Sequence, residues 1–187
     1  MEPRLLDHSL GEADYYDPRD YAGVFRRLLI YFIDLVVLVM LGVLMWIPLM
    51  FLIIGGVIRT DPSFLFWTTY LLVVWGYLAP IKRSRFGTLG YRLMGINIVS
   101  AQGGPPSLLV MTARMLIWIL TPFSLFVDLF WIGADSERQI LRDCYLGTYL
   151  IKRNAKAIGR GPVNLTRYFA MSFALAYPRV RRPKPTD

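Results

Sequence analysis

Long apolar stretches dominate the first half of the chain and define its class. Residues 28–58 contain a single charged residue, Asp34, and residues 63–81 contain none. About twenty consecutive apolar residues are enough for a helix to cross the hydrocarbon core of a bilayer. The pattern therefore predicts an α-helical integral membrane protein with two full transmembrane helices.

A third apolar segment, residues 107–133, is divided by Pro122. Proline interrupts the hydrogen-bond ladder of a helix, and each half, about a dozen residues, is too short to span a bilayer. We expect a broken third element that is re-entrant or interfacial, with a third full span as the alternative. In the first segment, Pro48 and the Gly55–Gly56 pair predict either an early end or a tilted helix.

Basic residues are concentrated in two of the segments that connect or follow the apolar stretches. Residues 82–106 hold four basic side chains and no acidic one, and residues 134–187 hold eleven basic side chains against four acidic ones. Short loops rich in Lys and Arg face the cytoplasm, whereas the connection at residues 59–62 carries one basic residue. The distribution predicts that both termini are cytoplasmic.

Outside the apolar segments, the chain divides by composition. We expect a polar N-terminal arm at residues 1–20, a membrane domain at residues 21–153 and a basic extension at residues 154–187. Within the extension, residues 165–177 form an apolar run that is too short to span. This run predicts a short interfacial helix lying on the membrane surface.

Two runs with strand-like composition follow glycines. INIVS follows Gly95, and TYLI follows Gly147. Both runs are rich in β-branched and aromatic residues, and a glycine before each one is typical of a turn. We expect them to pair as a small cytoplasmic β-like cap.

Composition agrees with a membrane protein and excludes several kinds of site. The chain is 55% hydrophobic and its mean hydropathy is +0.44, whereas soluble domains average about 45–50% apolar residues. One cysteine and one histidine cannot form an intramolecular disulfide, a Cys/His zinc site or a Cys–His catalytic pair. The stretch FGTLG lacks the spacing of a nucleotide-binding fingerprint. We therefore expect no enzymatic activity, no metal and no cofactor.

Charged residues near and inside the apolar segments are the candidate functional residues. Arg27, Tyr31 and Asp34 lie on one stripe of a helix, and Asp34 is about 10 Å deeper than Arg27. Because intramembrane charges are costly, they face protein or water, and we expect Asp34 to pair with Arg114. Asp128 is expected to meet Arg27 or the arginines of the cytoplasmic loop. Such pairs either hold helices in register or form an ion or proton path.

Four blocks of the chain resemble, in order, the RDD family of small membrane proteins. They are RRLLIYFID, GTLGYRLMGINIVSAQGGPPS, the basic residue of TARMLIW, and RQILRDCYLGTYLI, and together they cover about residues 21–153. The arginine and two aspartates that name the family fall on Arg27, Asp34 and Asp143, and Asp128 matches an acidic position of many members. The resemblance implies an integral protein of a bacterial plasma (inner) membrane.

The last block places Asp143 close to several arginines. We expect a cytoplasmic latch in which Asp143 meets Arg92, Arg138 and Arg142 and joins the cap to the membrane helices. This arrangement has no reacting group and serves to hold parts of the protein together.

The sequence predicts a non-enzymatic integral membrane subunit that assembles, stabilises or regulates a larger membrane complex. The alternative is an oligomeric transporter of protons or monovalent cations that uses Asp34 and Asp128. Because two or three spans cannot readily enclose a pathway, this alternative requires several copies. Expected partners are anionic lipid headgroups at the cytoplasmic face and other membrane subunits or copies of the chain, with no nucleic acid.

Overall fold

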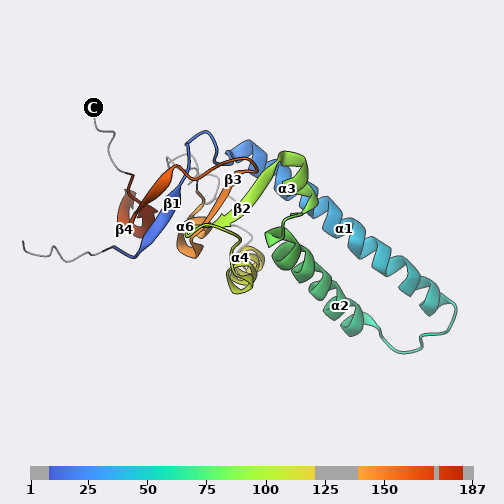
Figure 1. Ribbon diagram of the computed structural model, residues 1–187. Helices are drawn as coiled ribbons and strands as arrows, with labels where there is room; N and C mark the ends of the chain where they lie inside the picture. The colour runs from blue at the N-terminus through green and yellow to red at the C-terminus, as the bar shows by residue number, and fades with distance from the viewer. Residues whose placement is uncertain (1–8, 121–138, 171–172, 183–187) are drawn as a thin grey trace, which may run out of the picture.

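A hairpin of two apolar helices projects from a base of strands and short helices (Figure 1). The computed structural model describes residues 9–120, 139–170 and 173–182. The hairpin consists of α1 (Val24–Ile54), α2 (Ser63–Gly76) and a short π-helix, η1 (Tyr77–Ile81), that continues α2. Both arms, Val24–Ile54 and Ser63–Ile81, are long and apolar enough to cross a membrane. The prediction of two helices of this kind is therefore confirmed.

The base explains why α1 is longer than one span requires. Its first turns, as far as Asp34, pack against α3 (Leu89–Met94). From Leu35 to Ile54 the helix carries no charge, and these twenty residues measure about 30 Å, the thickness of a bilayer core. The helix continues through Pro48 and ends at Ile54, with Gly55 as its C-cap, and Gly56 follows with φ +71°. Apolar side chains remain exposed along this whole stretch.

The two arms of the hairpin approach each other closely at Tyr70. The Tyr70 hydroxyl donates a hydrogen bond to the Leu38 carbonyl at 3.0 Å. A Cβ on Gly42 would lie 3.1 Å from the Tyr70 ring, so glycine allows the two helices to approach here. Near the end of the second arm, Pro80 lies within η1. Proline has no N–H to give to a regular α-helical ladder, and a π-helical turn accommodates this loss.

A two-stranded antiparallel sheet lies beside the start of the hairpin. It pairs β2 (Ile96–Ser100) with β3 (Thr148–Lys152), with Ile96 opposite Lys152 and Ser100 opposite Thr148. Each strand follows a short helix: α3 precedes β2 and α6 (Leu141–Leu146) precedes β3. Gly95 and Gly147 end these helices with φ +64° and +57°, a left-handed conformation that favours glycine.

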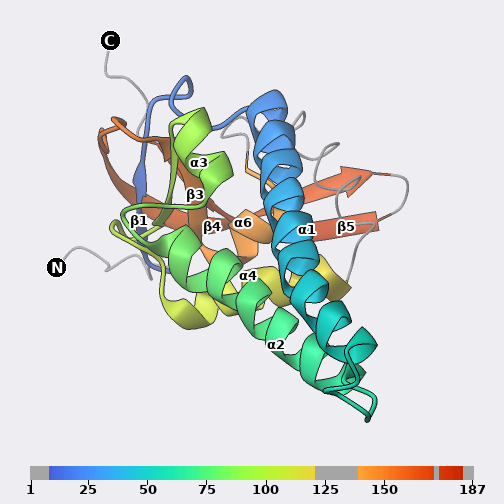
Figure 2. The ribbon, with the colours of Figure 1, turned by 90° about the vertical axis from the view of Figure 1, so that its right-hand side faces the viewer.

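The core of the base joins these elements to α1 and α4 (Leu108–Leu120). Side chains from α1, α3, α4, β2 and β3 are buried together: Ile30, Tyr91, Ile96, Ile98, Met111 and Leu150. Figures 1 and 2 together show α4 crossing the foot of the hairpin instead of running along it. As described, α4 has 13 residues, or about 20 Å. The remainder of the third apolar segment, including Pro122, lies outside the described residues.

A second sheet is formed by the two ends of the chain. Its order is β1 (Glu12–Tyr15), β4 (Gly159–Ala170) and β5 (Phe173–Val180), with antiparallel pairing throughout. The N-terminal segment predicted to be a polar arm thus contributes a strand, and its Ala13 and Tyr16 are buried against Tyr21 and Tyr149.

The interfacial helix predicted for residues 165–177 is wrong. The described residues of this run belong to β4 and β5, which form an antiparallel hairpin. In the part of β4 where side chains are described, exposure alternates: Leu165 and Arg167 are exposed and Thr166 is half-buried. This is the two-residue period of a strand. β5 pairs with Val163–Ala170 of β4, and β1 pairs with Gly159–Pro162.

Candidate site: two buried carboxylates

The Asp34 carboxylate receives hydrogen bonds from three other parts of the chain. Oδ1 accepts from the Tyr77 hydroxyl and from the Gly90 backbone N–H, both at 3.0 Å, and Oδ2 accepts from the Thr88 hydroxyl at 2.9 Å. The Lys82 ammonium lies 3.8 Å from Oδ2. Asp34 is 4% exposed, so these contacts replace the water that the charge would otherwise require.

The same contacts explain how α3 begins. The Tyr77 hydroxyl also accepts from the Leu89 N–H at 3.0 Å, and the Thr88 hydroxyl accepts from the Tyr91 N–H at 3.5 Å. Together with Gly90, three backbone N–H groups of the first turn of α3 are therefore bound to the carboxylate or to its hydroxyl partners. The N–H groups of a first helical turn have no partner within the helix, and negative charge is favourable there. Asp34 thus holds the start of α3 against α1.

Glycine at position 90 is required by this close approach. A Cβ there would lie 2.8 Å from Asp34 Oδ1 and 2.8 Å from the Ile30 carbonyl oxygen. Real Cβ atoms do not come this close to backbone oxygen, and the Ile30 carbonyl belongs to α1 and cannot turn away. Any larger residue would therefore push α3 off α1.

A second carboxylate, Asp143 at the start of α6, is held between two arginines. Arg27 of α1 donates from Nη1 to Oδ2 at 2.6 Å, and Arg114 of α4 donates from Nη1 to Oδ1. Arg114 also donates to the Thr148 hydroxyl at 2.9 Å, and Arg27 donates from Nε to the Ala22 carbonyl at 3.0 Å. Asp143 is 0% exposed. One carboxylate therefore joins α1, α4, α6 and the start of β3.

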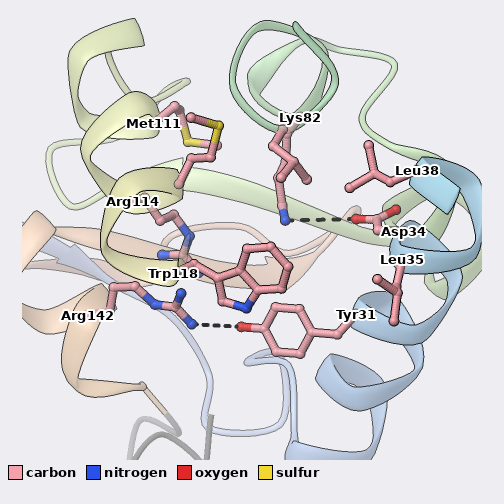
Figure 3. A pocket seen from close by; sticks show the side chains of 11 residues that line it. Tyr31, Asp34, Leu35, Leu38, Lys82, Met111, Arg114, Trp118 and Arg142 are labelled. Carbon is pink, nitrogen blue, oxygen red and sulfur yellow. Dashed lines mark hydrogen bonds and ion pairs between the residues drawn. The ribbon is translucent and has the colours of Figure 1, made fainter. Parts of the chain in front are cut away.

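A small cavity of about 40 Å³ lies beside the Asp34 carboxylate, and Arg114, the partner of Asp143, also lines it (Figure 3). This volume holds a few water molecules or a small ion, because one water needs about 10–15 Å³ measured in this way. In Figure 3 the Lys82 ammonium points toward Asp34, and Arg142 reaches the Tyr31 hydroxyl at 3.2 Å. The lining residues are Tyr31, Asp34, Leu35, Leu38, Leu78, Lys82, Met111, Arg114, Met115, Trp118 and Arg142.

The protonation of Lys82, beside this cavity, is strongly affected by its surroundings. Burial lowers the pKa of its ammonium to about 8, although the charge of Asp34 favours the protonated form. The positive charges of Arg114 and Arg142 lower the pKa further. The ammonium also lies 4.8 Å from the centre of the Tyr91 ring, a contact that favours the charged form.

The structure brings together most of the residues that the sequence singled out, but not in the predicted pairs. Arg27, Asp34, Arg114 and Asp143 are all buried. The prediction that Arg114 pairs with Asp34 is wrong: Arg114 pairs with Asp143, and Lys82 is the basic partner of Asp34.

The ion pairs of Asp143 in the structure differ from those of the predicted latch. Asp143 is its centre, but its partners are Arg27 and Arg114, whereas Arg92 is exposed. Arg142 is buried and donates to Tyr31. Asp128 and Arg138 lie outside the described residues.

Sequence reasoning missed Lys82, Tyr77 and Thr88. A basic residue directly after the second span and a Thr-x-x start to a short helix were available signals for two of them. Tyr77 is placed by the π-helical turn; Pro80 marks an irregularity in the sequence there, but not the direction in which Tyr77 points. Among the described residues, no group of three or more His, Cys, Asp or Glu side chains could hold a metal.

Comparison with known proteins gives one match. The model of the RDD family matches residues 21–147, which include Arg27, Asp34, Arg114 and Asp143. No curated protein and no solved structure matches the chain.

Proposed function

Because the chain belongs to the RDD family and has two helices that are long and apolar enough to cross a membrane, we propose that it is a non-enzymatic subunit of a larger membrane complex. In this function it assembles, stabilises or regulates its partners. The base, with both chain ends, lies on the cytoplasmic side of a bacterial inner membrane. Neighbouring subunits or further copies of the chain contact the hairpin.

The observation that carries this proposal is the position of Asp143 between Arg27 and Arg114. The three side chains come from α6, α1 and α4, and residues 27 and 143 are 116 positions apart. Asp34 likewise joins α1 to α3 and η1. Both carboxylates are occupied by fixed partners of the same chain, as expected for groups that set the geometry of a scaffold.

The hairpin supplies the surface for partners. Its arms touch one another along one side, and large apolar side chains on the other sides are exposed, including Phe51, Ile54, Phe64 and Leu65. No other segment of the described part of the chain covers these side chains. They therefore face lipid or the helices of other membrane proteins. A rigid base with a projecting apolar hairpin suits a subunit that docks beside other spans.

The orientation rests on charge. The turn after the second span carries Lys82, Arg83 and Arg85, and basic loops remain cytoplasmic. Cysteine labelling from outside should modify Asp61→Cys, in the loop between the arms, and leave Ser84→Cys untouched. Cys144 is buried, and a Cys144→Ser background removes it as a target. Labelling at position 84 alone would reverse the proposed orientation.

Purification in mild detergent tests the subunit proposal. We expect the chain to migrate in a complex of fixed stoichiometry with a second membrane protein, and deletion of the chain should lower the amount of that protein in the membrane. Asp143→Asn, which breaks the buried latch, should weaken partner retention. The matched control is Asp20→Asn, at a partly exposed pair with Lys152, and should not. Recovery of copies of this chain alone would contradict the proposal.

A second candidate function is transport of protons or monovalent cations by an oligomer. The specific observation in its favour is that Asp34 and Lys82, 3.8 Å apart, border the small cavity. Ion-flux assays in proteoliposomes should then show activity that Asp34→Asn abolishes while thermal stability is retained. Absence of flux from the wild-type oligomer would remove this candidate.

A further inference from the structure

The turn that follows the second span borders a basic groove. The groove has a volume of about 420 Å³ and is lined by residues 82–85 and 87, Tyr91 of α3, residues 97–99 of β2 and residues 104–105. Three of its lining side chains are basic, namely those of Lys82, Arg83 and Arg85. Among the described residues, no acidic side chain lines it.

Backbone hydrogen bonds fix the conformation of the turn that carries Arg83 and Arg85. The Ser84 N–H and hydroxyl both bind the Ile81 carbonyl, at 3.1 and 2.7 Å. The Gly87 N–H binds the Ser84 carbonyl at 3.1 Å, and Gly87 has φ +66°. Arg85 is exposed and Arg83 is half-buried. In the described part of the chain, neither arginine forms an ion pair.

The groove lies at the level where the membrane core begins. Lys82 is the first residue after the second span, and it faces Asp34, where the charge-free part of α1 starts. Headgroup phosphates occupy this level in a bilayer. Large apolar side chains flank the same turn and α3: Phe86 is 73% exposed and Leu93 62%. Basic and exposed apolar side chains side by side are typical of a surface that enters the interface.

We propose that this groove binds the headgroup of an anionic phospholipid, with Arg83 and Arg85 on the phosphate and Phe86 and Leu93 against the acyl chains. Charge complementarity favours an anionic lipid, and the exposed apolar side chains favour a lipid over free phosphate. The arginine guanidinium is suited to phosphate because its planar donors match the phosphate oxygens. The inference goes beyond the subunit function and does not depend on the identity of any partner complex.

Lipid retention measured on the full chain tests this site. The protein is reconstituted in nanodiscs of phosphatidylcholine with phosphatidylglycerol, and bound lipids are identified by native mass spectrometry. The groove variant is Arg83→Gln with Arg85→Gln. The matched control is Arg153→Gln with Lys156→Gln, which removes the same charge from exposed positions outside the groove. Retention of phosphatidylglycerol should fall about fivefold for each groove arginine removed and change little in the control.

Further experiments separate the possible outcomes. Soluble inorganic phosphate should not displace the bound lipid, and Phe86→Ser should weaken retention while both arginines remain. A phosphatidylglycerol that carries its photoactivatable group on the headgroup, added to the wild-type protein, should label residues 82–98, a readout that does not depend on any variant folding. Equal losses in groove and control variants, displacement by phosphate, or labelling spread over other segments would each overturn the proposal.

Discussion

Replacing Asp143 with alanine removes the carboxylate that Arg27 and Arg114 share. Both guanidiniums then lose this counter-charge while remaining in place, and in the folded protein Arg27 is 1% exposed and Arg114 6%. Removing one partner of a buried ion pair typically costs about 3–5 kcal/mol. Because whole domains are stable by only about 5–15 kcal/mol, Asp143→Ala should bring the base close to unfolding.

A double-mutant cycle separates this contact from general effects of burial. Arg114→Ala alone should cost less than Asp143→Ala, because Asp143 keeps Arg27. When both changes are combined, fewer charges lose a partner, and we expect a coupling energy of about 1–3 kcal/mol between positions 114 and 143. The control cycle pairs Arg114→Ala with Asp34→Ala. These two residues form no ion pair but line the same small cavity, so their coupling should be smaller than that between positions 114 and 143.

Thermal unfolding in detergent, followed by tryptophan fluorescence, measures both cycles. The gentler Asp143→Asn keeps the shape and one acceptor, so it provides a folded reference if the alanine variant does not accumulate. Additive effects at positions 114 and 143, or a larger coupling between positions 114 and 34, would refute the pairing described above.

Three other predictions concern single features. Gly90→Ala should lower stability by about 1–3 kcal/mol in thermal unfolding because of overpacking against α1, whereas the control Gly76→Ala, where nothing lies within 4 Å, should be neutral or slightly stabilising. Competitive amine labelling should report a pKa of about 8 for Lys82, and Asp34→Asn should lower that pKa further. Between this pKa and the ordinary 10.5 the unfolded chain holds more protons than the folded one, so the Lys82 contribution to stability should rise with pH across that window; a fall would contradict the burial. Truncation after Arg153 removes β4 and β5 and should destabilise the base in protease-resistance assays, because β1 loses its partner strand; an equally resistant truncated chain would show that the second sheet is dispensable.

The sequence predicts the membrane-crossing elements well because their signal is local. A long apolar run predicts each arm of the hairpin. The resemblance to the RDD family is confirmed by the match of the family model over residues 21–147. The stripe of Arg27 and Asp34 predicts that both face protein, and both are buried. Periodicity within one helix is sufficient for such statements because they concern only which side of that helix is covered.

Partners across the fold are a different matter. Helical spacing cannot show that Arg114 meets Asp143, because that contact depends on how α6 and β3 return to α4. The pairing of β1 with β4 is equally invisible, since β1 has only four residues and an ordinary polar composition. The Asp34 contacts depend on Gly90 coming close to α1, and a glycine in a sequence does not say what it approaches.

The β1–β4 pairing also constrains the order in which the protein is made. Asp14 of β1 and Arg160 of β4 form an ion pair although they lie 146 positions apart. At ribosomal rates of about 5–20 residues per second, β1 is synthesised roughly 7 to 30 s before its partner strand. Both arms of the hairpin are complete within that interval and can enter the bilayer first. Pairing of β1 with β4 then follows insertion of the hairpin, and until β4 is made the backbone N–H and C=O groups of β1 lack this partner strand.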